Sequence, residues 1–246
     1  MIDILRSEWT KIRSVRSTVW TLTVTAVLML GFSALLSAAA NSTADGPIPG
    51  DQAIKSSLSG GMLASLSMAT LGVLVISSEY RTGGIRTSLM AVPKRMSLLT
   101  GKIMAFVAVS MVVCAVAAAG AIGIGVAISR PPSIEMGEVA RASIGSGLYL
   151  TACGLFGLGL GTLIRHTPGA IVAVIALILV LPTVANQLPG AWGRTVAAYF
   201  TTNAGSLVVS GQGNDSLGPW SGFAVYLAWV AAAVISGAVL MRRRDA

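Results

Sequence analysis

The chain has 246 residues, of which 54% are hydrophobic and 11% are charged. A soluble domain carries roughly 25% charged residues, so a surface this poor in charge faces lipid rather than water. The net charge of +8 comes from basic residues spread between apolar runs, which fits membrane orientation and argues against nucleic acid as a partner.

Residues 2–16 predict an N-terminal amphipathic elbow helix in the membrane interface. Apolar residues recur every three or four positions on one helical face, with Trp9 at headgroup depth, while Lys11 and Arg13 lie elsewhere on the helix. A basic anchor for the first span and an elbow helix that touches a cytoplasmic partner explain this pattern equally well. A cleaved signal peptide is disfavoured, because the following apolar run is longer than the 7–15 residues of a signal core.

Uncharged runs of about 20 residues, the length that a spanning helix needs, recur six times. We therefore predict an all-α, polytopic membrane protein that forms a single transmembrane domain over residues 1–246. The predicted spans cover approximately residues 19–40, 56–78, 103–129, 142–164, 168–188 and 218–241. Residues 195–214 are uncharged but rich in hydroxyl and amide groups, which predicts a short re-entrant or interfacial segment outside the cytoplasm.

The distribution of Lys and Arg predicts the orientation of the six spans. If the N terminus is inside, the cytoplasmic segments hold all but four of the 17 basic residues. The four on the outside are Lys55, Arg130, Arg141 and Arg194. This strong positive-inside bias predicts a multi-pass protein of the cytoplasmic membrane with both termini in the cytoplasm.

The longest predicted cytoplasmic connection, residues 79–102, has the pattern of a docking element. Glu79 lies at a membrane edge, where a carboxylate needs a partner such as Arg81 or a helix end. The glycines at 83 and 84 bend the chain, and Leu89 then lies on one face of a short helix that Pro93 ends. Because most connections have about 4–6 residues, we favour a docking element over a plain linker.

Residues 79–102 resemble the signature of ABC transporter permeases of the ABC-2 export type. In that signature an acidic, an aromatic and a basic residue precede Gly-Thr, a helix, a Pro and a Gly-Lys that opens the next span. This chain has Glu79-Tyr80-Arg81, Gly83-Gly84, Pro93 and Gly101-Lys102, with Gly84 at the Thr position. The opening residues 8–13 and the basic ending Arg242-Arg243-Arg244-Asp245 are similar to actinobacterial members of that family.

The resemblance implies a permease subunit of an ATP-driven exporter, paired with a second permease copy or a paralogue and with a cytoplasmic ABC ATPase. ATP and Mg²⁺ would bind that partner, and the substrate would be an antibiotic, peptide or lipid of hydrophobic or amphipathic character. The residues expected to couple the spans to the ATPase are Glu79, Tyr80, Arg81, Gly83, Gly84, Arg86, Leu89 and Pro93. The alternative is a membrane anchor or sensor-complex subunit that docks a cytoplasmic partner without transporting anything.

Four polar residues are candidates for the translocation route, because by analogy with the family spans two and five border it: Ser65, Thr70, Asn186 and Gln187. Hydroxyl groups in a span can instead bond to their own helix backbone. The two amides can instead face lipid headgroups, which we favour. Gly157 and Gly161 are four residues apart, a spacing that allows close helix approach, and we favour packing within the chain over a dimer contact.

The sequence predicts that this chain is not an enzyme. No glycine stands five residues before Gly101-Lys102 and no Ser or Thr follows it, so the ATPase phosphate-binding motif is absent. One histidine and two cysteines in apolar runs predict no metal site. His166 beside Arg165 fits an interfacial cation better than a catalytic base. Since no charged residue lies well inside a span, a proton-driven antiporter is disfavoured.

Overall fold

The computed structural model describes residues 16–44, 46–82 and 95–243, and this part of the chain is helical, without strands. Six segments in it are long and apolar enough to cross a membrane. They cover Thr18–Thr43, Gly50–Ser78, Leu99–Ser129, Met136–Ile164, Thr167–Ala185 and Pro219–Met241. The prediction of an all-α fold with six membrane-spanning helices is therefore confirmed.

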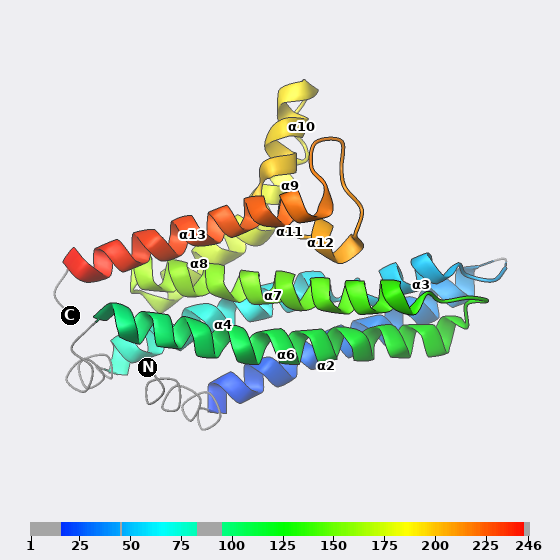
Figure 1. Cartoon of the computed structure of the whole chain (residues 1–246), viewed down its shortest axis with the longest axis horizontal. Helices are drawn as coiled ribbons and strands as arrows, with labels where there is room; N and C mark the ends of the chain where they lie inside the picture. Colours follow the sequence, from blue (N-terminus) through cyan, green and yellow to red (C-terminus); the bar gives the residue numbers. More distant parts are fainter. Residues whose placement is uncertain (1–15, 45, 83–94, 244–246) are drawn as a thin grey trace.

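The long helices run roughly along the long axis of the molecule (Figure 1). The end of α4, the start of α6 and the end of α13 lie at one end of the bundle, and the short helix α3 lies at the other (Figure 1). The long helices are α2 (Arg16–Thr43), α4 (Gly61–Thr82), α6 (Arg95–Ser129), α7 (Met136–Ile164) and α13 (Pro219–Arg243).

Two of these helices extend well beyond the apolar runs that predict them. Helix α6 has 35 residues and is therefore about 52 Å long, against roughly 30 Å for the hydrocarbon core. Helix α7 begins at Met136, so Glu138 and Arg141 lie in its first two turns. Charged side chains are tolerated there because a helix end can reach the solvated boundary of the bilayer. Apolar runs therefore locate the spans but not the ends of the helices.

Helix α7 is the centre of the bundle and contacts α4, α6 and α13. In its most apolar window 78% of the residues are buried, compared with 22% in the first span. A Cβ atom on Gly157 would overlap the carbonyl of Ala69 in α4, and one on Gly161 would meet Ile76. The close approach that the glycine spacing predicts therefore occurs within the chain, between α7 and α4.

The second span is interrupted before α4. Helix α3 (Gly50–Ser57) ends at the C-cap Leu58, and α4 starts at Gly61. A Cβ atom on Gly60 would come within 2.9 Å of the Phe32 Cβ in α2, so glycine allows the break to rest directly on that helix. The second span, predicted over residues 56–78, thus begins earlier, with the short helix α3, and continues as the long helix α4.

The fifth span begins at a cap formed by His166. Its Nδ1 accepts a hydrogen bond from the backbone N–H of Gly169 at 3.2 Å, at the start of α8 (Thr167–Ile175). His166 therefore serves as the N-cap of α8, and its role as an interfacial cation stays a prediction. The span continues through a π-helical turn, η1 (Ala176–Val180), into α9 (Leu181–Ala185).

Three short helices connect the fifth span to α13: α10 (Gly190–Tyr199), α11 (Thr201–Gly205) and α12 (Leu207–Ser210). Helix α10 stands out from the bundle, whereas α11 and α12 lie beside α13 and α7 (Figure 1). Backbone atoms of Val208 lie against Gly145 of α7, and Ala204 lies against Gly222 of α13. Residues 195–214 are therefore held on the bundle by close backbone contacts, and their re-entry into the bilayer stays a prediction.

Candidate functional site

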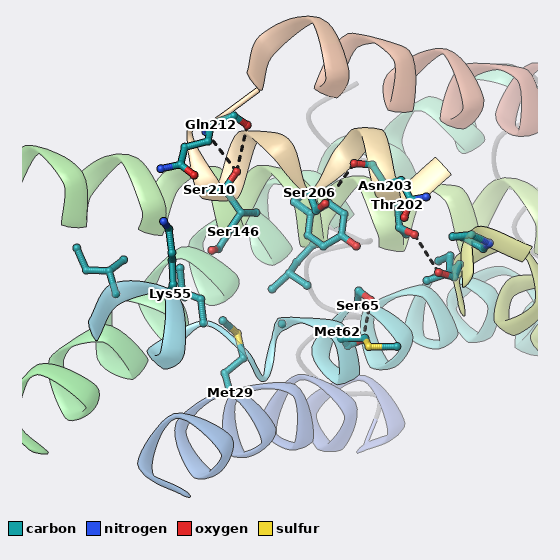
Figure 2. A pocket seen from close by; sticks show the side chains of 18 of the residues that line it. Met29, Lys55, Met62, Ser65, Ser146, Thr202, Asn203, Ser206, Ser210 and Gln212 are labelled. Atoms are coloured by element: carbon teal, nitrogen blue, oxygen red, sulfur yellow. Dashed lines mark hydrogen bonds between the residues drawn. The ribbon is translucent and has the colours of Figure 1, made fainter. Parts of the chain in front are cut away.

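A cavity of about 470 Å³ opens between the half of the bundle that carries α3 and the short helices α11 and α12. Volumes of 300–1,000 Å³ are typical of sites for small molecules. Residues of six regions line the cavity: α2, α3, α4, the first half of α7, the η1–α9 part of span five, and the segment 202–212. Figure 2 shows Met29, Met62 and Ser65 on one side of the opening and Ser206, Ser210 and Gln212 on the other.

The wall that span five contributes depends on Pro182, which lines the cavity. Residue 182 would donate to the carbonyl of Ile178 in an α-helix and to that of Leu177 in a π-helix. Proline has no N–H, so neither carbonyl receives a bond from residue 182. Thr201 Oγ1 donates to the Leu177 carbonyl at 2.7 Å, and Thr202 Oγ1 donates to the Ile178 carbonyl at 2.9 Å. Two hydroxyls of α11 thus take the place of the missing donor.

An amide pair extends the contact between span five and the short helices. Asn203 Nδ2 donates to Asn186 Oδ1 and to the carbonyl of Ala197, both at 3.0 Å. Both asparagines line the cavity. Hydrogen bonds from α11 to Asn186, which follows α9, and to α10 therefore cross-link the uncharged polar part of the lining and fix the shape of this wall.

The floor of the cavity is apolar, with single hydroxyl groups. Ser65 Oγ donates to the carbonyl of Met62 at 2.7 Å, one turn earlier in α4. Tyr149 and Leu150 of α7 border the same space. The Tyr149 ring lies 6.0 Å from that of Tyr226, whose hydroxyl donates to Cys153 Sγ at 3.2 Å. This aromatic cluster fills the space between α7 and α13 behind the cavity.

All four charged residues of the lining lie at one end, in α3 and the first two turns of α7. Lys55 Nζ lies 3.5 Å from Asp51 Oδ2, so these two charges balance each other. Glu138 and Arg141 form no ion pair in the part of the chain that the structure describes. The mouth of the cavity therefore presents the Glu138 carboxylate and the Arg141 guanidinium, which a ligand can bind.

The position of Arg141 depends on Gly211, the residue that ends α12. Its φ of 65° is left-handed, and its N–H donates to the carbonyl of Leu207 at 2.9 Å. The Arg141 guanidinium lies where a Cβ atom of residue 211 would be. Glycine thus allows both the left-handed turn and the contact that holds Arg141 against the segment after α12.

Two of the four predicted route residues, Ser65 and Asn186, line this cavity. Thr70 does not line it, since it lies about 140° around α4 from Ser65, and Gln187, in the turn after α9, does not line it either. Lys55, Glu138, Arg141 and the polar residues 202–212 were not predicted as site residues, because nothing local in their sequence connects them.

The predicted coupling residues have little structural description. Glu79, Tyr80 and Arg81 belong to the last turn of α4. Gly83, Gly84, Arg86, Leu89 and Pro93 lie outside the described residues, as do Trp9, Lys11 and Arg13 of the predicted elbow helix. Their roles remain predictions from the sequence.

Comparison of the sequence with protein families gives a match to the family described as ABC-2 family transporter protein, over residues 4–186. The chain belongs to this family. The match covers more than half of the chain, including the first five spans and therefore most walls of the cavity. A comparison with curated proteins gives no match.

As a member of the ABC-2 family, the chain is a multi-pass membrane component of an ABC transporter. The described residues contain no group of three or more His, Cys, Asp or Glu side chains placed to hold a metal ion. The cavity combines an apolar floor, neutral hydrogen-bonding groups and charges at one end. Such a lining is suited to binding an amphipathic molecule.

Proposed function

We propose that this ABC-2 protein is the permease subunit of an exporter that moves a hydrophobic or amphipathic compound across the cytoplasmic membrane. A separate cytoplasmic ATPase, with ATP and Mg²⁺, supplies the energy, and a second permease copy or a paralogue completes the membrane part. The family match over residues 4–186 is the observation that carries this proposal. Antibiotics, peptides and lipids are the candidate substrates.

The positions of charged residues support an energy source outside the chain. In the six described spans, the charged side chains Asp51, Lys55, Lys102, Glu138 and Arg141 all lie within about two turns of a span's first residue. Proton- and ion-coupled transporters usually place ionisable groups at membrane depth. The middle of each described span is free of such groups, as an ATP-driven carrier allows.

The coupling element is residues 79–95, which connect α4 to α6. Nucleotide-driven closure of the ATPase pushes on this segment and switches the spans between inward-facing and outward-facing packings. Since α4 ends and α6 begins at this segment, and both helices contact α7, a displacement here reaches helices that border the cavity.

Co-purification tests this assignment. The tagged permease is expressed with a candidate ABC ATPase encoded nearby, and the double variant Arg81→Glu plus Arg86→Glu is expected to lose the ATPase from the purified complex. The matched control is Arg130→Glu plus Arg194→Glu, an equal change of charge at the predicted outer face. Equal recovery of the ATPase with both double variants would show that residues 79–95 are not the docking element.

A second measurement tests transport. In proteoliposomes with the ATPase, amphipathic compounds that are substrates are expected to raise ATP hydrolysis and to accumulate on the side opposite the ATPase. ATPase binding without any such movement would favour the anchor or sensor function. A reporter fused after Asp245 that is active only outside the cell would contradict the proposed orientation.

A further inference from the structure

We propose that the cavity within one subunit is a binding site for a single-chain amphiphile with a zwitterionic head group. Its head group lies at the charged mouth between α3 and α7, and its chain lies along α7 toward the apolar floor. The proposal names the ligand class of the cavity. It rests on the proposed function only for the claim that this ligand is transported.

The charge of the cavity lining changes in one direction along α7. From Glu138 at the mouth to Leu150 at the floor, α7 advances twelve residues, or about 18 Å. The charged residues are confined to the first third of this path, and the rest of the lining is uncharged, with apolar residues such as Met29 and Met62 and neutral polar ones such as Thr202 and Asn203. An amphiphile fits this gradient in one orientation, with its head at the mouth.

The charges at the mouth select the type of head group. Because Lys55 and Asp51 balance each other, the groups left for a ligand are the Glu138 carboxylate and the Arg141 guanidinium. They stand three residues apart on α7, so their Cβ atoms are roughly 5–6 Å apart. A zwitterion with adjacent opposite charges pairs with both groups, whereas an anionic head is repelled by Glu138 and a cationic head by Arg141.

The mouth is held in place by its surroundings. The Arg141 guanidinium lies against Gly211, which limits its movement away from the cavity. Hydrogen bonds from the side chains of Thr201, Thr202 and Asn203 to Leu177, Ile178 and Asn186 fix the opposite wall. A site whose walls are set before the ligand arrives loses less conformational freedom on binding.

Native mass spectrometry of the full-length subunit in a maltoside detergent, without any ATPase, tests this proposal. The probes are lysophosphatidylethanolamine, lysophosphatidylglycerol and an alkyltrimethylammonium of equal chain length, added together. The zwitterionic probe is expected to bind roughly three- to tenfold more strongly than either of the others. Equal binding of all three, or preference for the anionic probe, would overturn the assigned ligand class.

Charge-neutral variants separate the two contacts. Arg141→Gln is expected to abolish the preference over the cationic probe, and Glu138→Gln the preference over the anionic probe. The matched controls Arg194→Gln and Glu135→Gln replace exposed residues that do not line the cavity and are expected to bind like the parent. Changes as large in the controls would contradict a site at the mouth.

Met62→Trp tests the location of the chain. The Met62 side chain is 56% exposed and borders the cavity, so the larger ring is accommodated by the fold but fills the floor. It is expected to reduce binding of all three probes, and unchanged binding would place the ligand elsewhere.

If the probes fail to bind but substrates still raise ATP hydrolysis by the complex, the ligand class is wrong and the proposed function stands. If the probes bind but no ATPase associates, the ligand class stands and the proposed function is wrong.

Discussion

The contact between α7 and α4 and the contact between α11 and span five differ in what lies between the backbones. At the first, glycines bring helix against helix: residues 72, 157 and 161 have no room for a Cβ atom. At the second, Thr201 and Thr202 insert hydroxyls that bond to the carbonyls of Leu177 and Ile178. Close packing suits a fixed interior, whereas side-chain hydrogen bonds support an irregular backbone that borders a cavity.

Gly157→Leu breaks the first contact and is expected to have the largest effect. The added side chain overlaps the Ala69 carbonyl, and the backbone of α4 has to move, which lowers the free energy of unfolding by about 3 kcal/mol or more. Thermal unfolding and size-exclusion elution in detergent measure the loss. Gly123→Leu is the matched control, because no atom lies within 4 Å of the corresponding Cβ. Equal stability of the two variants would disprove the close contact.

Thr201→Val breaks the second contact with less effect. It leaves the Leu177 carbonyl without its hydroxyl partner, which reduces the free energy of unfolding by about 1–3 kcal/mol. Pro182→Ala restores an N–H at the position that faces this carbonyl, so the double variant is expected to recover part of the loss. Thr195→Val, whose exposed hydroxyl bonds within α10, serves as the control. Strict additivity of the two substitutions would refute the compensation between Pro182 and Thr201.

Tyr226→Phe removes one side-chain hydrogen bond between α7 and α13 but keeps the packing of the ring. It is expected to have the smallest effect on stability. The ring contacts with Tyr149 and Phe156 remain, and only the hydroxyl donation to Cys153 Sγ is lost. Hydrogen bonds between membrane helices contribute about 0.6 kcal/mol on average, and sulfur is a weak acceptor. Thermal unfolding beside the exposed control Tyr199→Phe measures the difference. A loss above that of Thr201→Val would mean that this bond organises the core.

The sequence predicted what depends on local pattern. Six apolar runs gave the spans, and the spacing of Gly157 and Gly161 gave a close contact, because both features are properties of a single helix. The charged mouth was not predictable in this way. Asp51 and Glu138 lie in two helix starts far apart in the sequence, and only the folded bundle brings them to one cavity.

The irregular part of span five was also beyond sequence reasoning. The hydroxyl partners of Leu177 and Ile178 stand 24 residues later in the chain, in a segment rich in hydroxyl and amide groups, and no local pattern connects the two. Ser65 was singled out for its hydroxyl, yet that hydroxyl bonds to its own helix, as the alternative interpretation expected. Its place in the cavity lining follows from where α4 packs, which its neighbours in sequence do not encode.

The π-helical turn at Ala176–Val180 makes span five one residue longer than a regular helix of the same path would be. Deleting one residue within it would therefore restore a regular α-helix and leave the rotation of everything that follows nearly unchanged. Thr183 and Asn186 would keep their places in the cavity lining. Distant relatives with one residue fewer at this turn are therefore expected to keep the same cavity wall.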